Sequence, residues 1–94
     1  MAYVLNIETS TTNCSVALSQ NGSVVAHKED NSLEYSHAER LHVYIDEVLQ
    51  SAKVSIDQID AIAISKGPGS YTGLRIGVSA AKGLCYALDV PLIS

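Results

Sequence analysis

An Asn-Gly dipeptide at positions 21 and 22 constrains the fold of this chain more than any other feature of its sequence. A type I′ hairpin turn needs positive φ at both central residues, which asparagine and glycine tolerate better than other residues do. The run 14–18 before it alternates between apolar and small or polar residues, which is the period of a strand with one buried face. Residues 23–28 supply the returning strand, and the short apolar run 3–7 supplies an earlier one. We therefore predict three antiparallel strands at the start of the chain.

The hydrophobic period changes to that of a helix from Ser36 to about Lys53. Ser36 is a suitable N-cap, and Glu39 three residues later completes a capping box. A second helix is predicted from roughly Thr72 to Leu88. The apolar residues that recur at helical spacings are Ala38, Leu41, Ile45, Val48, Leu49 and Ala52 in the first segment, and Leu74, Val78, Ala81, Cys85 and Leu88 in the second.

Between the helices, the continuous apolar run 61–64 predicts a strand buried on both faces. The right-handed crossover rule places this strand beside the first strand and parallel to it. Residues 92–93 begin another apolar strand, so we expect the chain to be part of a longer protein. This order of strands and helices along the chain predicts an α/β, ribonuclease H-like lobe of the actin-like ATPase superfamily. Its mixed sheet has three antiparallel strands plus parallel strands, and it has two main helices. The alternatives are ferredoxin-like and Rossmann-like folds, and neither begins with three hairpin-linked strands.

Composition narrows the class of protein. A chain of 94 residues has room for one domain, and its 47% hydrophobic and 17% charged residues argue against intrinsic disorder. The formal net charge of −4 argues against unassisted nucleic-acid binding. No apolar run approaches the roughly 20 residues that span a bilayer, and the two cysteines match no metal spacing. We expect a reduced, soluble, cytoplasmic protein.

A polar segment after the first strand is one candidate phosphate site. Its residues are Glu8, Thr9, Ser10 and Thr11. A turn of this kind can present amides and hydroxyls to phosphates, with a carboxylate holding a hydrated metal ion. The same residue types also cluster in ordinary hairpin turns, because their side chains bond nearby backbone groups. The residues alone favour the ordinary turn.

A glycine-rich loop between the buried strand and the second helix is the other candidate. Its residues are Gly67, Pro68, Gly69, Ser70, Thr72, Gly73 and Arg75. The loop amides are expected at the carboxyl edge of the sheet, where ligands bind in open α/β folds, next to a helix N-terminus. The spacing is neither that of a Walker loop nor that of a dinucleotide fingerprint. A tight turn is the alternative, although the density of glycines favours a function. Arg75 opposes the helix dipole, so it is either solvated or directed at an anion or a partner carboxylate.

The titratable residues predict no chemistry of their own. His27, His37 and His42 lack metal-ligand spacing, and no nucleophile–base pair follows from the spacing of the chain. Cys14 and Cys85 alternate with core positions, as small buried apolar side chains do. We predict no catalytic residue, no metal site and no cofactor.

The second helix is apolar or small on nearly all sides, which is typical of a helix that is covered all round. Glycine in a helix interior costs about 1 kcal/mol relative to alanine, so Gly73 and Gly77 call for a compensating close approach. We predict a partner surface made of Gly73, Gly77, Ala80, Ala81 and Leu84, extended by Val43 and Tyr44 of the first helix. The alternative is that the small residues lie against the sheet.

Residues 65–77, SKGPGSYTGLRIG, closely resemble the signature of the TsaB (YeaZ) family. The runs 5–11 and 14–18 resemble the start of the same family, and His37 falls where that family carries a histidine. The resemblance covers the whole chain. It implies a non-catalytic scaffold or regulator in the formation of threonylcarbamoyladenosine (t6A) at tRNA position 37. Such a protein forms a homodimer or a heterodimer with a TsaD-like transferase, is joined by a TsaE-like ATPase, reaches tRNA only through that complex and contacts no membrane.

The chain departs from the family in two respects. The family usually has aspartate where this chain has Glu8, and the longer side chain would hold a metal-bound water elsewhere, which weakens a nucleotide role. The family has two lobes, and residues 1–94 resemble only the N-terminal lobe. The alternative function is the nucleotide-binding lobe of an actin-like or sugar-kinase-type phosphotransferase, which tight Mg-ATP binding would favour.

Overall fold

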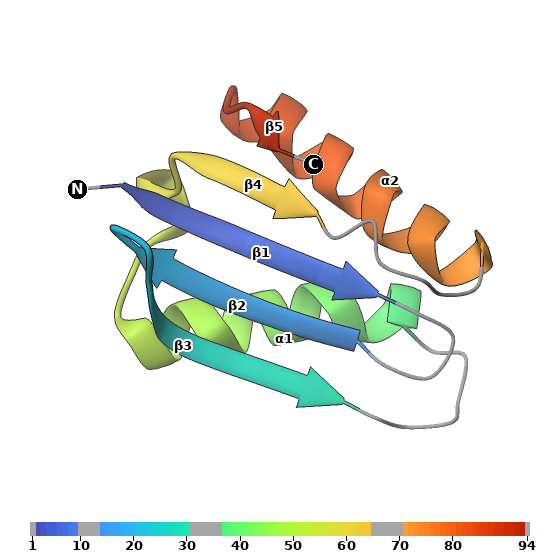
Figure 1. Cartoon of the computed structure of the whole chain (residues 1–94), viewed down its shortest axis with the longest axis horizontal. Helices are drawn as coiled ribbons and strands as arrows, with labels where there is room; N and C mark the ends of the chain where they lie inside the picture. The colour runs from blue at the N-terminus through green and yellow to red at the C-terminus, as the bar shows by residue number, and fades with distance from the viewer. Residues whose placement is uncertain (1, 10–13, 31–36, 65–70, 94) are drawn as a thin grey trace.

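The computed structural model describes residues 2–9, 14–30, 37–64 and 71–93. Within these ranges the elements are β1 (Tyr3–Thr9), β2 (Cys14–Gln20), β3 (Ser23–Asp30), α1 (His37–Ala52), the short 3-10 helix η1 (Ile56–Gln58), β4 (Ala61–Ile64), α2 (Tyr71–Leu88) and β5 (Leu92–Ile93). The strands form one sheet with the order β3-β2-β1-β4-β5 (Figure 1). β1, β2 and β3 are antiparallel, whereas β4 pairs in parallel with β1 and β5 pairs in parallel with β4. The predicted hairpin strands and the predicted parallel crossover are therefore confirmed.

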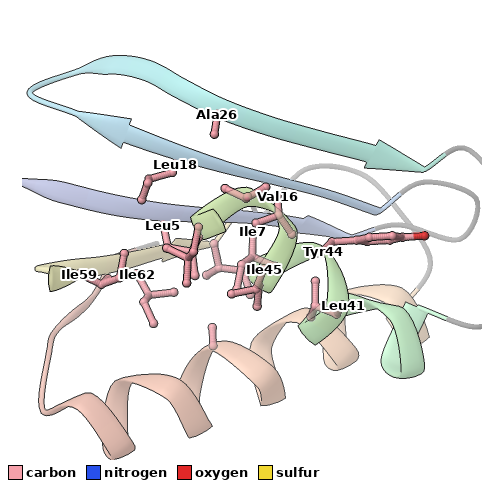
Figure 2. Close-up of a cluster of buried hydrophobic side chains, with 14 of the residues drawn as sticks. Leu5, Ile7, Val16, Leu18, Ala26, Leu41, Tyr44, Ile45, Ile59 and Ile62 are labelled. Atoms are coloured by element: carbon pink, nitrogen blue, oxygen red, sulfur yellow. The ribbon is translucent and has the colours of Figure 1, made fainter. Parts of the chain in front are cut away.

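One face of the sheet forms the hydrophobic core with the two helices. α1 packs on β2 and β3, and α2 packs on β1 and β4. Figure 2 shows the side chains of this core between the sheet and the helices. The strands contribute Leu5, Ile7, Cys14, Val16, Leu18, Ala26, Ile62 and Ile64, and the helices contribute Leu41, Tyr44, Ile45, Val48, Leu49 and Ala81.

The other face of the sheet is not covered by these helices. Val4, Asn6, Ala17 and Ala63 lie on it, and each is only partly buried. The prediction that the β4 strand is buried on both faces is therefore wrong for Ala63. The short side chains of Ala17 and Ala63 and the amide of Asn6 give this face little relief and a mixed polarity.

The Asn-Gly hairpin has the predicted backbone. Asn21 has φ of 53° and Gly22 has φ of 87°, as a type I′ turn requires. The turn also holds the start of the chain, since the Ala2 amide donates to Asn21 Oδ1 at 3.2 Å and the Asn21 amide donates to the Ala2 carbonyl at 3.1 Å. The hairpin therefore fixes both the β2–β3 pair and the residue that leads into β1.

A β-bulge interrupts the β2–β3 ladder after this turn. Ser19 pairs with Val24, but the next residue of β2, Leu18, pairs with Ala26, so Val25 is the extra residue. Because side chains alternate along a strand, one extra residue exchanges the faces of the rest of β3. Ala26 consequently enters the core, and Lys28 comes within 3.3 Å of Glu47 on α1, measured from Nζ to Oε2.

Both long helices end in a residue with positive φ that is not glycine. Lys53 has φ of 57° after α1, and Asp89 has φ of 56° after α2. The amide of the residue after each returns to the last turn, from Val54 to the Leu49 carbonyl at 3.0 Å and from Val90 to the Cys85 carbonyl at 3.1 Å. These bonds are those of a Schellman cap. The predicted N-cap Ser36 lies outside the described residues, and in the described part of the chain neither helix has the length and apolar character needed to cross a membrane.

Substitution of two glycines by alanine should change stability in opposite directions. Gly83 is helical with open space around its missing side chain, so Gly83→Ala should stabilise the chain by about 0.5–1 kcal/mol. Gly22 also has open space, but its φ of 87° strains an L residue, so Gly22→Ala should destabilise by about 1–2 kcal/mol. Urea unfolding of both variants measures the difference, and equal midpoints would contradict the turn geometry.

The two thiols should react differently in the folded chain. Neither cysteine forms a disulfide; Cys14 is fully buried, whereas Cys85 is half-buried and desolvation raises its pKa. A raised pKa reduces the reactive thiolate at a given pH. Iodoacetamide at pH 8 should therefore label Cys85 slowly and Cys14 only after unfolding, as mass spectrometry of the native and denatured chain would show. Rapid labelling of both thiols in the native chain would contradict this burial.

A candidate site on the open face of the sheet

A shallow hollow of about 250 Å³ lies on the open face of the sheet. Its lining consists of Asn6, Ile7, Glu8, Ser15, Ala17, Ala63 and Ile64. The hollow is near the carboxyl ends of β1 and β4, which run in parallel, and ligands usually bind at this end of open α/β sheets. Small alanine side chains form its floor, while an amide, a carboxylate and a hydroxyl supply its polar groups. The fold thus places a few polar groups around a small apolar surface, which is the usual composition of a binding site.

The predicted turn of Glu8, Thr9, Ser10 and Thr11 is divided by the structure. Glu8 and Thr9 belong to β1 rather than to the turn, so their side chains point to opposite faces of the sheet. Glu8 is exposed on the hollow, opposite Ser15, whereas Thr9 is 3% exposed on the helix side, opposite Cys14. Ser10 and Thr11 lie outside the described residues. The prediction that these four residues share one turn is therefore wrong for the first two.

Asn6 explains the polar interruption in the first apolar strand. Its Nδ2 donates to the Val4 carbonyl and to Ser19 Oγ, each at 3.3 Å, and is 3.5 Å from the Ala17 carbonyl. Ser19 Oγ in turn donates to the Val4 carbonyl at 3.4 Å. The amide is thereby anchored across β1 and β2. An asparagine in a central strand is tolerated here because it faces away from the core.

The bulge brings Ser15, His27 and Glu29 together beside the hollow. Ser15 Oγ is 3.3 Å from His27 Nε2, and Glu29 Oε2 is 3.9 Å from the same nitrogen. A Ser-His-acid triad needs its carboxylate on the opposite ring nitrogen, within hydrogen-bond distance. Both groups approach one nitrogen here, and the carboxylate is at ion-pair distance but too far away for a hydrogen bond. The cluster therefore lacks the geometry of a hydrolase triad.

No motif or residue spacing predicts this cluster. Regular pairing from the Asn-Gly turn would place His27 opposite Val16, on the core face, whereas the bulge pairs His27 with Ala17 on the open face. Among the described residues, no three His, Cys, Asp or Glu side chains are close enough to hold a metal ion. His42 is exposed on α1. The side chain of His37 is not among the side chains that the structure describes.

The strand that precedes the glycine-rich loop in the sequence ends at the hollow. β4 ends at Ile64, which lines the hollow, and α2 begins at Tyr71. Residues 65–70, with Gly67, Pro68, Gly69 and Ser70, lie outside the described residues. The backbone of Thr72, Gly73 and Arg75 belongs to the first turns of α2, although their side chains are outside the description. A phosphate-binding role of this loop stays a prediction.

The predicted partner surface is only partly exposed. Ala81 is fully buried against the sheet, and Tyr44 is a core residue, so the prediction that Tyr44 extends an exposed partner surface is wrong. Figure 2 shows its ring at the margin of the core with the hydroxyl pointing outward. Ala80 and Leu84 are partly buried against the same core, whereas Val43 is 42% exposed. Gly73 and Gly77 belong to α2, but their burial is outside what the structure describes.

Comparisons with known proteins agree on one pathway. A family model for TsaD, tRNA N6-adenosine threonylcarbamoyltransferase, matches residues 24–94. The tRNA threonylcarbamoyladenosine biosynthesis protein TsaB of Haemophilus influenzae is 39% identical over 90 residues, and that of Escherichia coli is 40% identical over 90 residues. Each alignment covers 96% of this chain but only 37% and 38% of the relative. A Bacillus thuringiensis transferase is 36% identical over 105 residues, which cover 96% of this chain and 31% of the relative.

Solved structures support the same assignment. YeaZ from Pseudomonas aeruginosa is 38% identical with a TM-score of 0.87, and the match covers 99% of this chain and 42% of YeaZ. RuvC from Thermus thermophilus is 14% identical with a TM-score of 0.63, covering 98% of this chain and 62% of RuvC, and shows the fold alone. The predicted ribonuclease H-like fold is confirmed. The chain therefore belongs to the TsaB (YeaZ) family.

Proposed function

We propose that this chain acts in the formation of t6A at tRNA position 37 as a non-catalytic, cytoplasmic partner of a TsaD-like transferase. The supporting observation is the length of the alignments with the two kinds of relative. The TsaB relatives align over 90 positions, but the transferase alignment extends over 105, so the transferase carries extra residues within the matched region. The chain thus follows the TsaB pattern of length more closely than the pattern of the transferase.

We also propose that this chain is the N-terminal lobe of a two-lobed protein. The chain spans less than two-fifths of the length of its curated TsaB relatives. A cleft between two lobes would add a second wall to the hollow near Glu8. A non-catalytic role is supported by the Ser15–His27–Glu29 geometry, in which the carboxylate does not orient the histidine.

Reconstitution of t6A formation tests this role. We expect tRNA modification by a TsaD-like transferase and a TsaE-like ATPase to need this chain, and to survive Ser15→Ala and His27→Ala with little change. Modified nucleoside is measured by mass spectrometry of digested tRNA. Loss of activity in either variant, at unchanged binding to the transferase, would indicate a catalytic role instead.

The partner surface is proposed on the two helices. Val43 supplies an exposed apolar contact on α1, and Gly73, Gly77, Ala80 and Leu84 supply small or apolar positions on α2. α1 and α2 contact each other on the same side of the sheet, so one partner can reach both (Figure 1). The partner is a TsaD-like protein or a second copy of this chain. The TsaE-like ATPase joins the resulting pair.

A charge on α1 should weaken this association. Val43→Glu should raise the dissociation constant for the TsaD-like partner, or for the homodimer, at least tenfold (about 1.4 kcal/mol), because the carboxylate would be desolvated in the interface. Val24→Glu is the matched control, since Val24 pairs with Ser19 and is exposed on the open face of the sheet, opposite the helices. Analytical ultracentrifugation measures both. Equal effects of the two substitutions on the dissociation constant would show that Val43 of α1 is not part of the interface.

The alternative is a nucleotide-binding lobe of an actin-like or sugar-kinase-type phosphotransferase. The hollow favours it, because the hollow lies at the carboxyl ends of the parallel strands β1 and β4, and Ile64 at the end of β4 lines it. Glu8 is the carboxylate that could face a nucleotide-bound metal there. The burial of Thr9 weighs against it, since that hydroxyl is directed away from the hollow.

Calorimetry with Mg-ATP separates the two functions. For the scaffold role, we expect no micromolar binding to the chain without a partner. Glu8→Gln, which keeps the size of the side chain and removes its charge, should then behave as the wild type does. Micromolar binding that Glu8→Gln weakens would instead support the phosphotransferase lobe.

The chain alone should bind tRNA weakly. Its net charge of −4 opposes the phosphate backbone, and counterion release needs basic contacts. At about 150 mM salt we expect a dissociation constant above the micromolar range in a filter-binding assay, and tighter binding once the transferase partner is added. A sub-micromolar, salt-sensitive complex with the chain alone would contradict this indirect contact.

A further inference from the structure

We draw no further inference here: the strongest candidate, the exposed face of α2 around Ser79, Lys82, Gly83 and the 91% exposed Tyr86, is unpartnered in the described part of the chain, and nothing in the structure shows what covers it.

Discussion

Burial of one sheet face under two helices is the interaction on which the rest of this structure depends. Leu5, Ile7, Val16, Leu18 and Ile62 lie on that face, and each is almost completely removed from water. Full burial of such a side chain is worth about 1.5–3 kcal/mol, so these few residues supply a large part of the stability of a small domain. The two helices do not pack against the opposite face of the sheet. It can therefore carry Asn6, Glu8 and Ser15, whose polar groups would be costly in the core.

The elements could be predicted from the sequence because each has a local cause. The Asn-Gly turn fixes a hairpin through its two positive φ angles, and the apolar stripe of α1 fixes a helix through its spacing. The crossover rule then determines where β4 pairs. The two helix C-termini were less visible, because lysine and aspartate take the left-handed position where glycine is usual. η1 was not predicted, although Ser55 and Gln58 form a capping box around it.

The placement of side chains was harder to predict than the elements. A strand boundary two residues later than expected separates Glu8 from Thr9, and one extra residue in β3 moves His27 to the open face. Tyr44 lies beside the apolar stripe of α1, where only the packing against β2 and β3 decides that its ring is buried. Site residues depend on register and on tertiary contacts, which a single sequence does not encode locally. The family resemblance was predictable from the sequence, because the glycine motif is long enough to be specific for one family.

The bulge in β3 has a consequence for how copies of this chain can meet. β3 is an edge strand, and its exposed Val24 and Val25 would otherwise present a flat apolar template for another strand (Figure 1). The unpaired residue at the bulge twists that template, and the charged residues Lys28 and Glu29 follow it. The bulge and these charges therefore protect the β3 edge of the sheet from aggregation by strand addition.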